Sequence, residues 1–91
     1  MIRSFRHKGL ALLFNAGDRR GVRPDLVKRV EKRLAVLNAA KRLQDVALPG
    51  WRLHALKGQG RWAIDVNGPW HLTFAWGEDG DACDVDLEQY H

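Results

Sequence analysis

The sequence predicts an α+β fold in which two N-terminal helices pack on a small, mainly antiparallel sheet of four to five strands. Apolar residues recur at helical spacing in the first 40 residues and alternate with other residues from residue 51 onward. Asn67-Gly68 and Asp79-Gly80 are typical of hairpin turns between strands. A chain of 91 residues has room for one modest core. We therefore expect a single domain over residues 1–91.

The first half of the chain predicts a short strand and two helices. Met1–Phe5 alternates apolar and polar residues, as a first strand at an edge or in the centre of the sheet would. Helical spacing begins at His7, and Gly17 stands where a glycine cap ends a helix. The second helix is expected to begin at Pro24, and residues 41–47 predict a short helical turn. The apolar stripe of the second helix consists of Leu26, Val27, Val30, Leu34 and Leu37.

Four further strands are expected over residues 51–57, 61–66, 70–76 and 82–87. Alternation sends Trp62, Ile64, Val66, Trp70, Leu72, Phe74 and Trp76 to the core. The single cysteine, Cys83, excludes an internal disulfide and is expected on the core face with Val85 and Leu87. One reduced cysteine suits the cytoplasm, and no apolar run approaches the ~20 residues that span a membrane. We therefore expect no membrane partner.

Charge is distributed very unevenly along the chain. Residues 1–61 hold all 15 Lys and Arg against four acidic residues, whereas residues 62–91 hold seven acidic residues and no Lys or Arg. Such a basic region favours a polyanionic partner, above all a nucleic acid. The predicted RNA- or ribosome-binding residues lie in the loop after the first helix, on the outer face of the second helix and in the strand expected over residues 51–57. They are Arg19, Arg20, Lys28, Arg29, Lys32, Arg33 and Arg52. A solvated basic surface remains the alternative.

The candidate catalytic residues are imidazoles, a phenol and an ammonium. Alternation places His54 and His71 on the face of the sheet away from the core, with Lys57 at the following turn. The sequence ends in Tyr90 and His91, which would join this cluster if they pack on the same face. These groups suit proton transfer and charge stabilisation at phosphate, where RNA supplies its own 2′-hydroxyl nucleophile. The alternative is a solvated strand face and a frayed terminus.

A metal site is not expected, and neither is another cofactor. His54, His71, His91 and Cys83 contain no local ligand pair of the Cys-x-x-Cys or His-x-x-x-His kind. The aspartates near the end of the chain also lack the glycine of a calcium-binding EF-hand loop.

Four segments together resemble the HigB killer toxins, a branch of the RelE/ParE-like toxins of bacterial toxin–antitoxin pairs. They are Met1–Leu10, Leu48–Gly58, the Asn-Gly-x-Trp-x-x-Thr-Phe segment of residues 67–74, and the closing Asp-Gly-Asp-Ala…Glu-x-Tyr-His. The resemblance implies the RelE/ParE-like α+β fold and metal-independent cleavage of mRNA in the ribosomal A site. It also implies a helix-turn-helix antitoxin, through which alone operator DNA would be bound. By position, His54 and Lys57 match the family's strand histidine and lysine, and Tyr90 and His91 match its terminal pair.

Two positions depart from this family pattern. Family members usually carry arginine where this chain has His71, and aspartate where it has Gln89. Arginine is a permanent cation that holds phosphate with two hydrogen bonds, whereas an unperturbed histidine is mostly neutral at pH 7. The departures predict a weakened nuclease that is most active below neutral pH. They also leave open a non-enzymatic ParE-like inhibitor of DNA gyrase, or a catalytically weak toxin that binds ribosomes and antitoxin.

Overall fold

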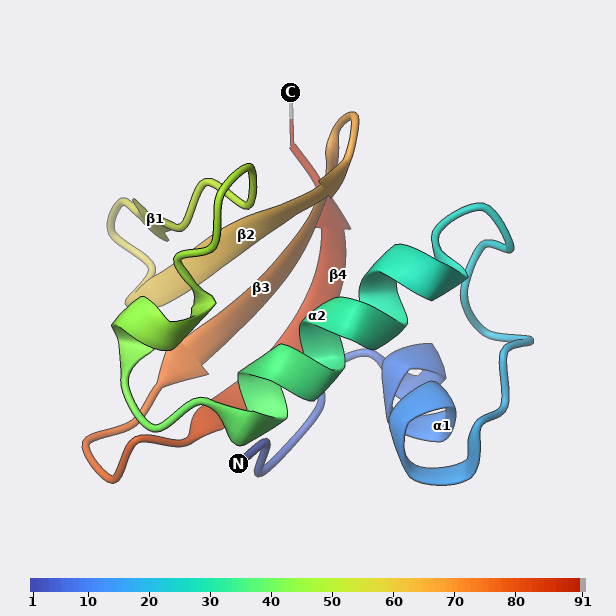
Figure 1. Ribbon diagram of the computed structural model, residues 1–91, viewed down its shortest axis with the longest axis horizontal. Coiled ribbons are helices and arrows are strands. Elements are labelled where there is room, and N and C mark those ends of the chain that lie inside the picture. The colour runs from blue at the N-terminus through green and yellow to red at the C-terminus, as the bar shows by residue number, and fades with distance from the viewer. Residues whose placement is uncertain (91) are drawn as a thin grey trace.

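Two helices pack against a four-stranded antiparallel sheet whose spatial order is β1-β2-β3-β4 (Figure 1). The computed structural model describes residues 1–90 of the chain. The elements are α1 (Lys8–Ala16), α2 (Val27–Ala39), the 3₁₀ turn η1 (Leu43–Val46), β1 (His54–Leu56), β2 (Arg61–Asn67), β3 (Trp70–Trp76) and β4 (Ala82–Gln89). The predicted α+β class is confirmed.

Both helices begin and end for local reasons. His7 caps α1, because its Nδ1 accepts a hydrogen bond from the Leu10 N–H at 3.1 Å. Gly17 ends α1 in the left-handed conformation, with φ of 67°. Helix α2 begins at Val27, later than the predicted start at Pro24. The intervening residues form a turn instead, in which the Leu26 N–H bonds to the carbonyl of Arg23 at 2.9 Å.

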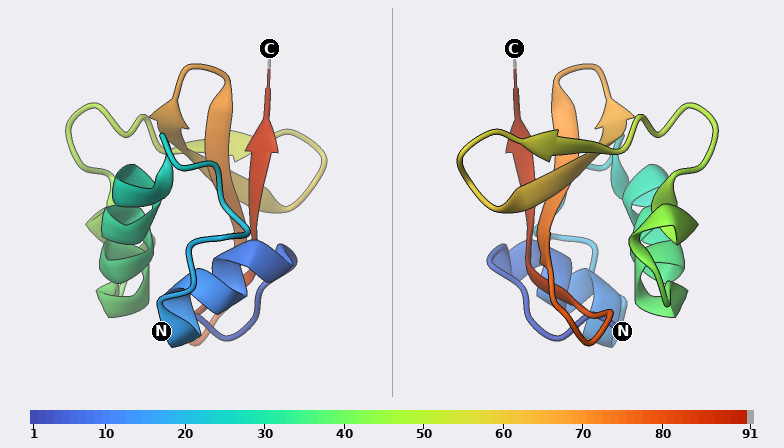
Figure 2. Two further views of the ribbon diagram at one scale, coloured as in Figure 1. Left: turned by 90° about the vertical axis from the view of Figure 1, so that its right-hand side faces the viewer. Right: turned by 90° about the vertical axis from the view of Figure 1, so that its left-hand side faces the viewer.

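The core lies between the helices and one face of the sheet. The whole predicted stripe of α2 is buried, and it packs with apolar residues of the strands, among them Ile64, Val66, Leu72, Phe74, Val85 and Leu87. In Figure 2 (right) the edge strand β1 is nearest the viewer, and α1 lies behind the sheet. The second face of the sheet is thus free of helices.

Strand β1 is shorter than the predicted strand over residues 51–57. Gly50 and Arg52 both adopt left-handed backbone conformations, with φ of 82° and 50°, and these bend the chain before His54. Trp51 is buried in this bend rather than in a strand. Residues 1–5 likewise form no full strand: Ile2 and Phe5 make isolated parallel bridges beside β4.

A bulge in β4 reverses the expected orientation of the cysteine. Thr73 pairs with Asp86 whereas Ala75 pairs with Cys83, so β4 contains one extra residue, and Asp84 there has φ of 50°. The bulge places Cys83 on the face of Ala75, away from the core. The prediction that Cys83 shares the face of Val85 and Leu87 is therefore wrong.

Candidate active site

The helix-free face of the sheet carries a row of polar side chains from three adjacent strands. Asp65 of β2 pairs with His71 of β3, which in turn pairs with Glu88 of β4. In the neighbouring row, His54 of β1 pairs with Ala63, and Ala63 pairs with Thr73. Because paired residues in antiparallel strands share a face, His54 and His71 lie on the same surface.

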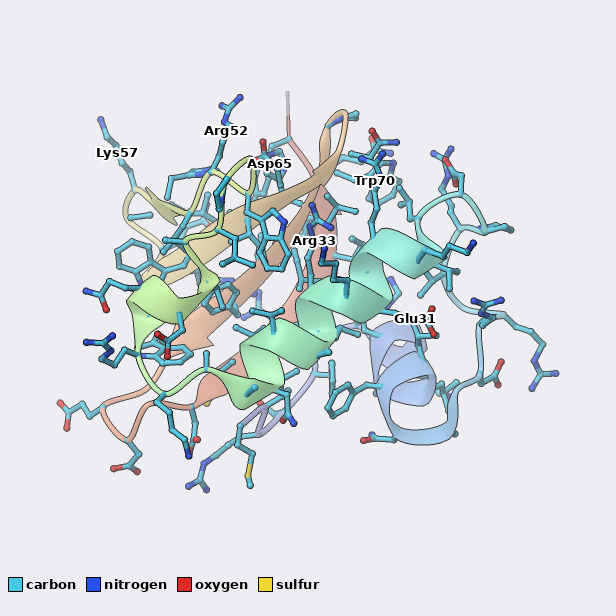
Figure 3. All side chains as sticks on the ribbon, viewed as in Figure 1. Glu31, Arg33, Arg52, Lys57, Asp65 and Trp70 are labelled. Carbon is cyan, nitrogen blue, oxygen red and sulfur yellow. The ribbon has the colours of Figure 1, made fainter. Side chains whose placement is uncertain are left out.

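Three of the five predicted catalytic residues converge on this surface. The His54 and His71 ring centroids lie 5.8 Å apart at an interplanar angle of 86°. The Tyr90 ring lies 5.4 Å from that of His71, at 71°. The fourth, Lys57, is exposed at the turn after β1, and Figure 3 shows it extending into solvent on the same side of the molecule as Arg52. The fifth, His91, lies outside the described residues.

Backbone carbonyls orient both imidazoles. His54 Nδ1 lies 2.6 Å from the Arg52 carbonyl oxygen, and His71 Nδ1 lies 2.9 Å from that of Pro69. A carbonyl oxygen only accepts hydrogen bonds, so each Nδ1 carries a hydrogen and donates it. This tautomer leaves Nε2 of His54 as an acceptor, the form that a general base requires.

The carboxylate of Asp65 lies between a histidine and an arginine. Its Oδ1 is 3.1 Å from His71 Nε2, and its Oδ2 is 3.4 Å from Arg52 Nε. Oδ1 is buried, and among residues 1–90 it meets no well-aligned hydrogen-bond donor. Asp65 Oδ1 and His71 Nε2 are therefore close enough for an ion pair but are not aligned as a hydrogen bond.

Tyr90 belongs to a second polar cluster that crosses β2, β3 and β4. Its hydroxyl donates to Glu88 Oε2 at 3.3 Å, and Thr73 donates to the same oxygen at 2.5 Å. Arg61, which is buried, donates to the Thr73 hydroxyl at 3.1 Å and to the Asp84 carbonyl at 2.7 Å. Burial, and next the charge of Glu88, raise the pKa of Tyr90 above its ordinary value. The phenol thus stays protonated at neutral pH and acts as a hydrogen-bond donor.

One of the predicted RNA-binding residues is placed differently from the expectation. Lys28, Arg29 and Lys32 are exposed on α2, but Arg33 is only 8% exposed. Its guanidinium stacks 4.6 Å from the Trp51 ring centroid and donates to the Asp65 carbonyl at 2.6 Å. Burial, and next the charge of Arg29, lower the pKa of Arg33. The prediction that Arg33 lies on the outer face of the helix is wrong, because Arg33 flanks the apolar stripe of α2 and the Trp51 ring covers its guanidinium. Figure 3 shows the Arg33 side chain extending from α2 toward the strands.

The arginines after α1 are already paired with acids. Arg20 donates to both carboxylate oxygens of Asp18, at 3.0 and 2.9 Å, and these bonds lower the pKa of Asp18 to about 2. Arg19 lies 3.4 Å from Glu31. The remaining predicted RNA-binding residue, Arg52, has a side chain 78% exposed. Among these arginines, Arg52 is the one beside the histidines.

Sequence reasoning missed Asp65, Glu88, Thr73 and Arg61. The alternation that assigned His71 to the helix-free face also applies to Asp65 and Thr73, so the signal was present in the pattern. The same register places Gln89 opposite Trp70, on the other face from His71. At this end of β4, the carboxylate that faces the histidines is that of Glu88.

Two further properties concern the described part of the chain as a whole. Within residues 1–90, no three His, Cys, Asp or Glu side chains lie close enough together to hold a metal ion. None of the helices described is both long and apolar enough to cross a membrane.

Comparison with known proteins agrees with the resemblance drawn from the motifs. A sequence model of the family described as "RelE-like toxin of type II toxin-antitoxin system HigB" matches residues 3–91. The protein named endoribonuclease HigB from Proteus vulgaris is 40% identical over 93 aligned positions, which cover 100% of both chains. The chain therefore belongs to the HigB family of RelE-like toxins of type II toxin–antitoxin systems.

Proposed function

We propose that this toxin is a ribosome-dependent endoribonuclease that cleaves mRNA through the RNA's own 2′-hydroxyl. The observation that carries the proposal is the convergence of His54, His71 and Tyr90 on the helix-free face of the sheet, with the exposed Arg52 beside them. The name of its Proteus vulgaris relative supports the same activity. A protein that only binds a partner has no evident use for a tautomer-fixed imidazole next to a protonated phenol.

We propose a role for each of these groups. Nε2 of His54 takes the proton from the 2′-hydroxyl, whose oxygen attacks the adjacent phosphorus. The bond from phosphorus to the 5′-oxygen breaks, which leaves a 2′,3′-cyclic phosphate and a 5′-hydroxyl. The Tyr90 phenol has one hydrogen, which it donates to Glu88 at 3.3 Å in the free protein; it would turn this hydrogen to a non-bridging phosphate oxygen as negative charge develops there. His91 remains the predicted donor of the proton to the leaving 5′-oxygen.

The cations divide between two surfaces. Arg52 lies beside His54, and Lys57 extends from the same side of the molecule as Arg52 (Figure 3), so both would hold the mRNA backbone near the scissile phosphate. Lys28, Arg29 and Lys32 lie on α2, which covers the opposite face of the sheet. These three residues would contact ribosomal RNA instead, because the substrate strand cannot reach both faces at one phosphate.

As a type II toxin, the protein has a cognate antitoxin. We propose that this antitoxin carries a helix-turn-helix domain and that the toxin reaches operator DNA only through it. The proposed substrate, mRNA on translating ribosomes, sets the place of action in the cytoplasm.

The test is induced expression of the wild type and of His91→Ala, followed by mapping of mRNA 5′ ends. We expect cuts phased with the reading frame in the wild type and their loss in the variant. Relaxation of DNA supercoiling without phased cuts would identify a ParE-like gyrase inhibitor and overturn the proposal.

A further inference from the structure

The backbone of Asp65 is held at both of its polar groups. Its N–H donates to the Trp51 carbonyl at 2.7 Å, and its own carbonyl accepts from the buried Arg33 at 2.6 Å. The backbone is thus held from the Trp51 bend and from α2 at once.

The carboxylate meets His71 at a nitrogen whose state matters. Nδ1 of His71 donates to the Pro69 carbonyl, so a neutral ring would present the bare lone pair of Nε2 to Asp65 Oδ1, 3.1 Å away. Two lone pairs at that distance repel each other, and the buried Oδ1 has no aligned donor among residues 1–90 that would offset the repulsion. A hydrogen on Nε2 removes this repulsion and gives the ring a positive charge that attracts the carboxylate.

The same carboxylate reaches the second imidazole indirectly. Asp65 Oδ2 lies 3.4 Å from Arg52 Nε, and the Arg52 carbonyl accepts the hydrogen bond that orients His54. Arg52 adopts a left-handed backbone conformation, with φ of 50°, which a non-glycine residue rarely adopts without outside support. Contact with Asp65 supplies part of that support.

We propose that Asp65 is a positioning residue of this site, which keeps His71 as an imidazolium and, through Arg52, maintains the orientation of His54. The positively charged His71 then supports the neighbouring His54 and Tyr90 rings and does not contact RNA. Both of its nitrogens face protein acceptors, its side chain is only 13% exposed, and its ring packs edgewise against His54 and Tyr90. The kinetic part of the inference rests on the proposed ribonuclease activity.

This role changes the expected pH dependence. The charged or titratable groups that face His71 are Asp65 from β2, Glu88 from β4, His54 from β1 and Tyr90 after β4. Two of these four are carboxylic acids, and both favour a positive ring. The sequence alone predicts weak cleavage at neutral pH because His71 replaces an arginine. Asp65 offsets that loss by retaining the positive charge.

The direct test is the ¹⁵N NMR signal of the His71 ring at pH 7.5, assigned by its absence in His71→Gln. We expect imidazolium shifts in the wild type and in Asp65→Glu, and neutral-ring shifts in Asp65→Asn. A neutral ring in the wild type, or equal spectra for the Asn and Glu variants, would overturn the proposal. This measurement needs no RNA, so it stands even if the proposed activity fails.

The kinetic test compares single-turnover mRNA cleavage on ribosomes across pH 5.5–8.5. We expect Asp65→Asn to lower kcat at pH 7.5 by roughly tenfold, with a smaller change in KM and an optimum displaced to lower pH. The matched control is Asp81→Asn. It also removes one negative charge, but Asp81 pairs with Arg3 away from the site, so this variant should keep the wild-type pH profile. A wild-type kcat and profile for Asp65→Asn would refute the positioning role.

Discussion

Replacing His54 with glutamine is expected to abolish most RNA cleavage and to leave the fold intact. Glutamine retains an amide N–H that can donate to the Arg52 carbonyl, as His54 Nδ1 does at 2.6 Å, but it cannot take a proton at neutral pH. The substitution thus removes the base and preserves much of the local hydrogen bonding. Because the side chain is half-buried and packs against one ring, we expect stability to change by less than about 1 kcal/mol.

The size of the kinetic effect follows from the role of the imidazole. A positioned general base contributes on the order of 10²–10⁴ in rate. This corresponds to about 3–5 kcal/mol of transition-state stabilisation at 1.36 kcal/mol per tenfold change. Since the Nε2 of His54 acts only when the 2′-hydroxyl loses its proton, the loss should be seen in kcat and not in KM. Single-turnover cleavage of ribosome-bound mRNA measures it.

His7 provides a matched histidine control far from the site. Its Nδ1 caps α1, so His7→Ala is expected to cost about 0.5–2 kcal/mol of stability without slowing cleavage. His54→Gln should therefore lower the cleavage rate with little loss of stability, whereas His7→Ala should lower stability without lowering the rate. If His54→Gln cleaves within tenfold of the wild type while remaining folded, the assignment of His54 as the base is wrong.

Two further outcomes follow from the pairing of charges. Tyr90 is the sole tyrosine, so tyrosinate absorbance reports its titration alone; Glu88→Gln should lower the pKa of Tyr90 by removing a neighbouring negative charge, whereas the exposed Asp79→Asn should not. Equal midpoints in the two variants would show that Glu88 does not act on the phenol. For ribosome binding, the measured quantity is the slope of the logarithm of the binding constant against the logarithm of the salt concentration. Lys32→Gln should reduce this slope by about one unit, and Arg20→Gln by less, because Asp18 already neutralises Arg20. Equal slopes for these two variants would contradict this reading of the charged surface.

The fold could be predicted because its signals are local in the chain. The stripe on α2 follows helical periodicity, and Gly68 adopts a positive φ of 56° as the first residue of the turn between β2 and β3. The late start of β1 could not be predicted, because it depends on Arg52 in a conformation that its residue type does not favour. The bulge at Asp84 likewise has no signal in the alternation, which it interrupts.

Only the residues of the site that follow strand alternation could be placed from the sequence. A period of two placed His54 and His71 on one face, and the sheet register brings their rings together. The burial of Arg33 could not be inferred, since it requires Trp51 to fold back over the flank of α2. The importance of Asp65 depends on the same bend, which brings Arg52 beside its carboxylate.

The bridges that join Ile2 and Phe5 to Ala82 and Val85 connect segments about 80 residues apart in the sequence. Strand β4 also supplies Glu88 and leads into Tyr90, so the same strand holds residues 1–5 and carries part of the polar surface beside His71. A substitution that detaches β4 is therefore expected to release residues 1–5 and to disrupt this surface in one step.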